Sequence, residues 1–438
     1  MMKMVIEMET MEDVILARNQ LDATKITDIE DGVAVELVLS PKIFQEEMNS
    51  ELAEAFCLTM NSLGSSLSLL AEMKIASDPD NDNEAFVPVS ALGIALKKAR
   101  CLTSLTIENC TMMGEIWQYD QFATSFEAHD ELFEVDFDRC KCLVREQDPE
   151  TLKWSTDYLR KDGLCLLDST LSALGNLSSL AILSFEGCII PGELQKETIR
   201  RVCTLPEIFL LKLASFRLKP SVLKELCEVL RGNERLWGLS LSSSSFDQTN
   251  GGPLKELFQT TPSLEDFSIF AKNATSNNVK DILEAMGESN QMTAILSAPK
   301  MAISSNEVLA CARAAFRNNY SMESLTLYGY QDKGAAKSYD MTAICDHELN
   351  FLTKANMMGR GALLTGTLIP CVEKKMWVDL FEAAAKEAEI AKNESKNTGR
   401  GTKRKRAPQK EQEAIHLSNI YNLIAQKPEH LCRWILEN

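Results

Sequence analysis

The sequence predicts an α/β solenoid, in which a curved parallel sheet lines the inside, helices cover the outside and a helical segment closes the C-terminal end. Three observations predict this fold. A short strand motif recurs along the chain, the copies are evenly spaced, and an apolar residue precedes each copy at a fixed distance. A repeat array also lets 438 residues fold without one oversized core.

The strand motif is LxxLxLxx followed by Asn or Cys, as in LTSLTIENC at 102–110 and LAILSFEGC at 180–188. Eight copies align on their central apolar residue: Leu105, Val135, Leu183, Leu211, Leu239, Phe267, Ile295 and Leu325. From Leu183 to Ile295 these residues are 28 positions apart, and two other steps are of 30. Alternation along a strand predicts that they point inward, whereas flanking residues such as Ala294 and Leu296 face outward.

A helix is predicted before each strand, because the position six residues ahead of the motif is always apolar. These positions are Leu96, Phe126, Leu174, Val202, Leu230, Phe258, Met286 and Phe316. In PSVLKELCEVLRGN at 220–233, Pro220 suits the first helical turn and Gly232 the end. Ser305 is a predicted N-cap of the helix in 305–319.

This period and strand core resemble the leucine-rich repeats of ribonuclease-inhibitor-like proteins over residues 67–330. The predicted organisation is an N-terminal cap at 1–66, about nine repeats at 67–335 and a helical region at 336–438. One step is of 48 residues, so an insertion is expected near 141–166. There Trp154 and Tyr158 either pack the insertion onto the solenoid or bind a partner.

The C-terminal region resembles a helical element found in ribonuclease-inhibitor-like repeat proteins of single-celled algae. The matching residues are Asn356, Gly359, Arg360, Trp377, Leu417, Ser418 and Tyr421. Within this region, 393–412 is polar and basic, and we expect it to be disordered. Its cluster Lys403, Arg404, Lys405 and Arg406 is either a nuclear-localisation signal or part of a solvated linker.

The net charge of −17 favours basic proteins as partners and argues against nucleic acid and membranes. The first residues are interrupted by Glu7, Glu9, Glu12 and Asp13, unlike a signal peptide. The 13 cysteines are an odd number in a long chain, so we expect reduced thiols buried in the repeats. An intracellular protein, cytoplasmic or nuclear, is therefore predicted.

No enzyme motif is recognised, and no cofactor or metal is predicted. The four histidines, His129, His347, His416 and His430, have no Cys or His at metal-ligand spacing. The predicted function is a non-catalytic protein-binding scaffold or adaptor. One alternative is regulation of a small GTPase, since Ran GTPase-activating proteins resemble this repeat type, and another is an inhibitor that occludes an enzyme.

The candidate binding surface is the concave strand face, formed by side chains that alternate with the core positions. Its predicted binding residues are Glu108, Glu134, Asp136, Asp138, Glu186, Lys212, Asp266, Phe270 and Tyr328. Three carboxylates on one strand, at 134, 136 and 138, repel one another unless a cationic partner neutralises them. The alternative is that a solvent-facing strand tolerates them. The sequence predicts neither the partner's identity nor an oligomeric state.

Overall fold

The computed structural model describes residues 2–8, 33–39, 70–77, 85–99, 101–147, 154–157, 163–243, 251–271, 273–289, 293–302, 306–330, 342–343, 347–358 and 360, with single helical positions between 375 and 386. The chain divides into two compact units, Met1–Ser245 and Phe246–Asn438. Each unit contains strands that alternate with helices along the sequence.

The main sheet of the first unit is parallel throughout, and its strands follow the order β1-β2-β3-β5-β7-β10-β11-β12. The strands are β1 (Met2–Met8), β2 (Val33–Leu39), β3 (Leu70–Ser77), β5 (Ser104–Glu108), β7 (Glu134–Asp138), β10 (Ile182–Glu186), β11 (Leu210–Leu218) and β12 (Gly238–Ser243). Strands β1 and β2 belong to the segment predicted as an N-terminal cap. The parallel ladder therefore starts before the first recognisable repeat.

A second sheet of this unit was not predicted. It has the order β4-β6-β8-β9, with β4 (Ala85–Pro88), β6 (Cys110–Gly114), β8 (Lys141–Gln147) and β9 (Trp154–Asp157). Strand β6 starts two residues after β5 ends, so the chain turns directly from one sheet into the other. The predicted insertion contributes the antiparallel hairpin β8–β9, and Trp154 begins β9. Tyr158 lies outside the described residues.

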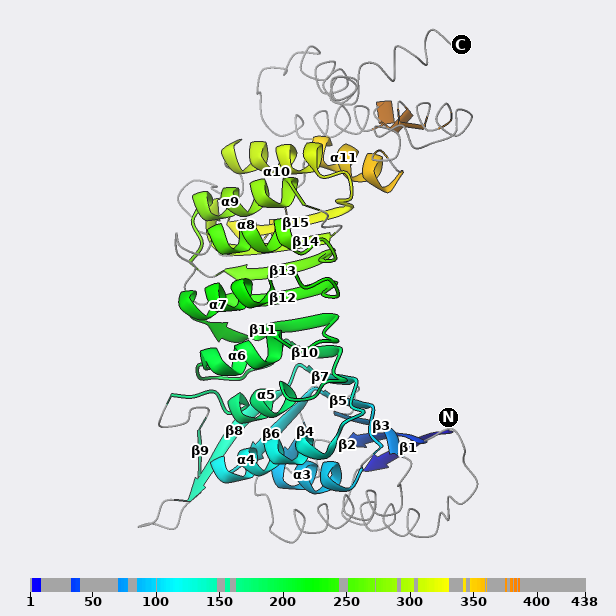
Figure 1. Ribbon diagram of the computed structural model, residues 1–438, viewed down its shortest axis with the longest axis vertical. Coiled ribbons are helices and arrows are strands. Elements are labelled where there is room, and N and C mark those ends of the chain that lie inside the picture. Colours follow the sequence, from blue (N-terminus) through cyan, green and yellow to red (C-terminus); the bar gives the residue numbers. More distant parts are fainter. Residues whose placement is uncertain are drawn as a thin grey trace, which may run out of the picture. The chain divides into compact units, whose positions relative to one another are not determined.

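Each helix of the first unit packs against the next along the chain, and Figure 1 shows α5, α6 and α7 stacked beside the strands. The helices are α3 (Val89–Lys98), α4 (Ile116–Ser125), α5 (Asp168–Leu174), α6 (Lys196–Cys203) and α7 (Pro220–Leu230), with the short helix η2 (Phe126–Ala128). Helix α7 has Pro220 in its first turn, as predicted. Cys203 in α6 and Cys227 in α7 are buried thiols.

The core between strands and helices confirms the predicted repeat. The central residues from Leu105 to Phe267 are at most 2 % exposed, as are all eight predicted helix positions. Phe137, Phe185 and Phe216 continue the core along β7, β10 and β11, with ring centroids 4.7 and 4.9 Å apart. No single repeat can bury these side chains alone, so stacking of repeats stabilises the fold. The predicted fold class, an α/β leucine-rich-repeat solenoid, is confirmed.

The second unit repeats the same alternation. Its elements are α8 (Gly251–Thr260), β13 (Asp266–Ala271), α9 (Ser276–Gly287), β14 (Thr293–Ala302), α10 (Asn306–Asn318), β15 (Ser324–Tyr330), β16 (Thr342–Ala343) and α11 (His347–Met357). Strands β13, β14 and β15 are parallel, and β16 is antiparallel to β15. The predicted N-cap Ser305 lies outside the described residues.

The predicted register of β14 is wrong by one residue. Ala294, not Ile295, pairs with Phe267, so the step between these repeats is 27 residues rather than 28. Consequently Ala294 and Leu296 are buried and Ile295 is 44 % exposed. Side chains alternate with a period of two, so a one-residue shift reverses which residues face outward.

Helix α11 packs against α10, and two residues of the algal resemblance, Asn356 in α11 and Arg360 after it, are buried. Asn356 Nδ2 donates to the carbonyl oxygens of Asn319 (3.1 Å) and Met322 (2.6 Å). Arg360 donates to the carbonyl of Phe316 at the end of α10, and burial lowers its pKa to about 10. The predicted cap beyond Arg360 stays a prediction, because most of 361–438 lies outside the described residues.

Candidate functional site

The open strand face of the first unit consists of side chains on the side of the sheet opposite the buried core residues. Along β5 and β7 exposure alternates strictly, with outward residues half-buried and inward residues buried. Parallel pairing aligns the outward residues in rows across the strands, for example Thr106, Asp136, Ser184 and Lys212. All six candidate residues of this unit, Glu108, Glu134, Asp136, Asp138, Glu186 and Lys212, occupy outward positions.

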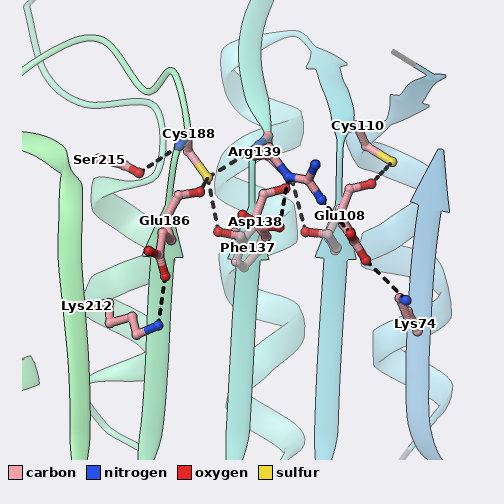
Figure 2. Close-up of polar contacts among 12 residues, drawn as sticks. Lys74, Glu108, Cys110, Phe137, Asp138, Arg139, Glu186, Cys188, Lys212 and Ser215 are labelled. Carbon is pink, nitrogen blue, oxygen red and sulfur yellow. Dashed lines mark hydrogen bonds and ion pairs between the residues drawn. The ribbon is translucent and has the colours of Figure 1, made fainter. Parts of the chain in front are cut away.

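Ion pairs neutralise three of the predicted acids, as Figure 2 shows. Glu108 lies 3.1 Å from Lys74 Nζ and 2.6 Å from Arg139 Nη2. Asp138 contacts Arg139 Nε at 3.0 Å, and Glu186 contacts Lys212 at 2.7 Å. These exposed pairs stabilise the fold little, about 0–1 kcal/mol each. Their main effect is to remove much of the negative charge expected at this end of the strands.

Arg139 was not among the predicted site residues, although it organises this network. It follows β7 at a corner where the backbone is left-handed, with φ of 53°. Asn109 (φ 52°) and Gly187 (φ 64°) occupy the same corner after β5 and β10. Asn and Gly favour this conformation. Asn109 and Gly187 stand at the positions aligned with Arg139, and this was the signal in the sequence for a turn at position 139.

Buried thiols follow these corners and tie the repeats together. Cys140 Sγ donates to the carbonyl oxygen of Ile107, and Cys188 Sγ donates to that of Phe137, both at 3.1 Å. Burial raises the pKa of the Cys142 thiol nearby. These thiols are therefore structural groups of the repeat, as the sequence predicts for Cys at this position.

Glu134 and Asp136 differ from their neighbours, because neither is in an ion pair within the described part of the chain. Glu134 accepts a hydrogen bond from Ser104 Oγ at 3.1 Å. Burial raises the pKa of Asp136, and the charges of Asp138 and Glu134 add to this, while a hydrogen bond with Ser184 and the charge of Lys212 act in the opposite direction. Within the described residues, these are the two carboxylates of β7 that are not in an ion pair.

Aromatic side chains stand directly before the strands, and the predictions missed them. Phe133, Phe209 and Trp237 are 50, 44 and 37 % exposed. Main-chain hydrogen bonds, such as Trp237 N to Phe209 O at 2.8 Å, hold these positions in the ladder. The rings of Phe209 and Trp237 are stacked, with centroids 5.5 Å apart. The signal in the sequence was the second position of the strand motif. In these three copies, an aromatic residue stands there and follows a buried Leu or Ile.

Ile182 and Leu210 are half-buried outward residues at the start of β10 and β11. Leu210 directly follows Phe209 in the chain. We call the exposed or half-buried apolar residues at the start of the four neighbouring strands β7, β10, β11 and β12 the apolar band: Phe133, Ile182, Phe209, Leu210 and Trp237. Glu134 pairs in register with Ile182, which in turn pairs with Leu210. Glu134 is therefore next to Ile182 in the ladder and next to Phe133 in the chain.

The second unit carries the other three candidates. Asp266 accepts a hydrogen bond from Thr293, Phe270 is exposed, and Tyr328 is half-buried. Phe270 and Tyr328 both pair with Ser297, so they lie on the same face of β13 and β15. Ile295, predicted to be a core residue, is exposed on this face as well.

Among the described residues no group of three or more His, Cys, Asp or Glu could hold a metal ion. In the same residues no helix is long and apolar enough to span a membrane. His129 is buried, and its Nε2 lies 2.8 Å from the carbonyl oxygen of Leu96. The cluster Lys403–Arg406 lies outside the described residues.

No protein-family model and no curated protein sequence matches the chain. Among solved structures, it is similar to TLR13 in complex with ssRNA13, at 12 % identity and a TM-score of 0.36, covering 75 % of this chain and 38 % of that one. It is also similar to the leucine-rich-repeat protein LegL7 from Legionella pneumophila, at 12 % identity and a TM-score of 0.36, covering 80 % and 97 % of the two chains. The expectation that nucleic acid is not a partner stays a prediction.

Proposed function

We propose that the chain is a non-catalytic scaffold that binds a partner protein on its open strand face, and that the partner presents a basic or mixed surface. One observation carries this proposal. Glu134 and Asp136 stand on this face without an ion pair within the described residues, whereas Glu108, Asp138 and Glu186 are paired.

Two carboxylates on one strand repel each other, and burial already disfavours the charged form of Asp136. An arginine or lysine of a partner would relieve both effects when it reaches the strand. The same charge would accelerate association with a basic surface, and this acceleration decreases as the salt concentration rises.

Affinity capture with the full chain tests the proposal. The bait is compared with a Glu134→Lys, Asp136→Lys variant and with a control, Glu127→Lys, Glu284→Lys, that makes the same change of charge at exposed residues outside the strands. We expect a protein that is recovered by the wild type and the control but lost with the first variant. Equal recovery by all three baits contradicts the proposal, provided that circular dichroism shows each variant to be folded.

The alternatives give different results in the same experiment. Recovery of a GTPase that depends on the added nucleotide supports the regulator. Recovery of an enzyme whose activity falls on addition of the chain supports the inhibitor. Recovery that is abolished by ribonuclease indicates an RNA partner instead of a protein.

A further inference from the structure

The apolar band crosses four consecutive strands of the first unit. Its residues stand at the start of β7, β10, β11 and β12, which are neighbours in the sheet. At about 4.8 Å between strands, the band is about 14 Å long. An extended chain of four or five residues covers this length, since each residue spans about 3.4 Å. The band therefore matches a short segment that runs across the strands.

The two ends of the band differ in chemistry. At β7, Phe133 is followed by Glu134 and, one outward position further, by Asp136. At β11 and β12, the stacked rings of Phe209 and Trp237 form an exposed aromatic surface, with Leu210 beside it. A ligand that matches both ends carries a cation at one end and large apolar side chains at the other.

We infer that the apolar band, with Glu134 and Asp136, binds an extended segment of a partner protein that carries an arginine or lysine a few residues from aromatic or aliphatic side chains. The cation lies over β7, where it meets both carboxylates and the face of Phe133. The apolar side chains lie on Phe209 and Trp237. This inference rests on the proposed function and specifies which part of the strand face is used.

Charge favours a protein over single-stranded RNA as the occupant. Aromatic rings stack with bases as readily as with apolar side chains. The phosphates of RNA, however, would approach Glu134 and Asp136, which have no ion-pair partner among the described residues. A protein segment with a basic residue gains from the same two carboxylates.

A library of random 12-residue peptides, selected on the immobilised full chain, tests the inference even while the natural partner is unidentified. The best peptide is synthesised with a fluorescent label, and its Kd is measured by anisotropy. Three variants are compared: Phe209→Ala, Trp237→Ala; Glu134→Gln, Asp136→Asn; and the control Trp117→Ala. Trp117 is an exposed aromatic residue of α4, outside the strands.

We expect enriched peptides to contain Arg or Lys near aromatic or aliphatic residues. Loss of the two rings weakens binding about 100-fold, that is about tenfold for each central aromatic anchor. Loss of the two carboxylates weakens it about tenfold and removes most of its dependence on salt. The control changes the Kd less than about twofold.

Three results overturn the inference. One is enrichment of peptides without basic residues, and another is a Kd that the Phe209, Trp237 variant leaves unchanged. The third is tighter binding of a 12-nucleotide oligouridine than of any peptide, lost on removal of the same rings. If peptides depend instead on Phe270, the strand face still binds protein and only the location is wrong. If no peptide is enriched, the inference fails, and affinity capture decides the proposed function separately.

Discussion

Replacing Arg139 by alanine or by glycine separates two opposing contributions to the stability of the first unit. The left-handed backbone at this corner, with φ of 53°, costs a residue with a Cβ atom about 1–2 kcal/mol. The exposed ion pairs of Arg139 with Glu108 and Asp138 return about 0–1 kcal/mol each. Arg139→Ala loses the pairs and keeps the backbone cost, whereas Arg139→Gly loses both.

We therefore expect Arg139→Gly to be more stable than Arg139→Ala by about 1–2 kcal/mol and to lie within about 2 kcal/mol of the wild type. Urea unfolding followed by circular dichroism measures these differences. At about 1 M salt, screening removes the contribution of the exposed pairs, so the stability of the wild type falls relative to that of Arg139→Gly. The difference between alanine and glycine stays, because its origin is the backbone.

Gly187 provides the matched control at the same corner of the next repeat, with φ of 64°. A Cβ atom there would lie 3.1 Å from Arg139 Cγ, a flexible side chain, so the backbone conformation dominates the effect. We expect Gly187→Ala to destabilise the unit by about 1–2 kcal/mol. Equal stability of the alanine and glycine variants at position 139, at both salt concentrations, would refute this reasoning.

Three further variants test other contacts. Tyr119→Phe removes a buried hydroxyl that hydrogen-bonds two main-chain carbonyl oxygens, and we expect a loss of about 1–2 kcal/mol in urea unfolding. Asp136→Asn should stabilise the fold at neutral pH. The pKa of Asp136 is raised in the folded state, so the wild type loses stability as the pH rises above the ordinary value of 3.8, and asparagine does not. In thermal unfolding, the variant should therefore have no advantage over the wild type below that pH. Asn356→Ala should destabilise the second unit by about 2 kcal/mol through two lost hydrogen bonds, whereas Met357→Ala, at an exposed neighbour, should not.

Each of these expectations has a contradicting result. Tyr119→Phe with wild-type stability would mean that water satisfies the two carbonyls. An advantage of Asp136→Asn that grows toward low pH would reverse the sign argued for its pKa. Equal effects of the alanine substitutions at 356 and 357 would show that the hydrogen bonds of the asparagine contribute nothing specific.

The periodicity of buried residues made the fold predictable. Each repeat must bury the same two or three strand positions and the same helix position, so Leu183 or Leu230 can be identified from the motif alone. The register of β14 could not be predicted in this way, because Ala294 and Ile295 are both apolar and each can take the central position of the motif. Pairing with Phe267 decides between them, and pairing depends on the adjacent strand.

The candidate site was only partly predictable. Alternation along β7 placed Glu134, Asp136 and Asp138 on one face, as the structure has them. The sequence did not reveal that Arg139 and Lys74 reach across strands to Glu108, because the corner at Arg139 sets the direction of its side chain. The aromatic rings of the apolar band were missed because they precede the alternating part of each strand.

Photo-crosslinking to the captured partner tests the central claim, that the open strand face holds another protein, most directly. A photoreactive side chain is placed at Thr106 or Ser240 on the strand face, or at Lys224 or Glu197 on the exposed surface of α7 and α6. Binding on the strand face predicts crosslinks from Thr106 and Ser240 and none from the two helix positions. Crosslinks from Lys224 or Glu197 alone would contradict it.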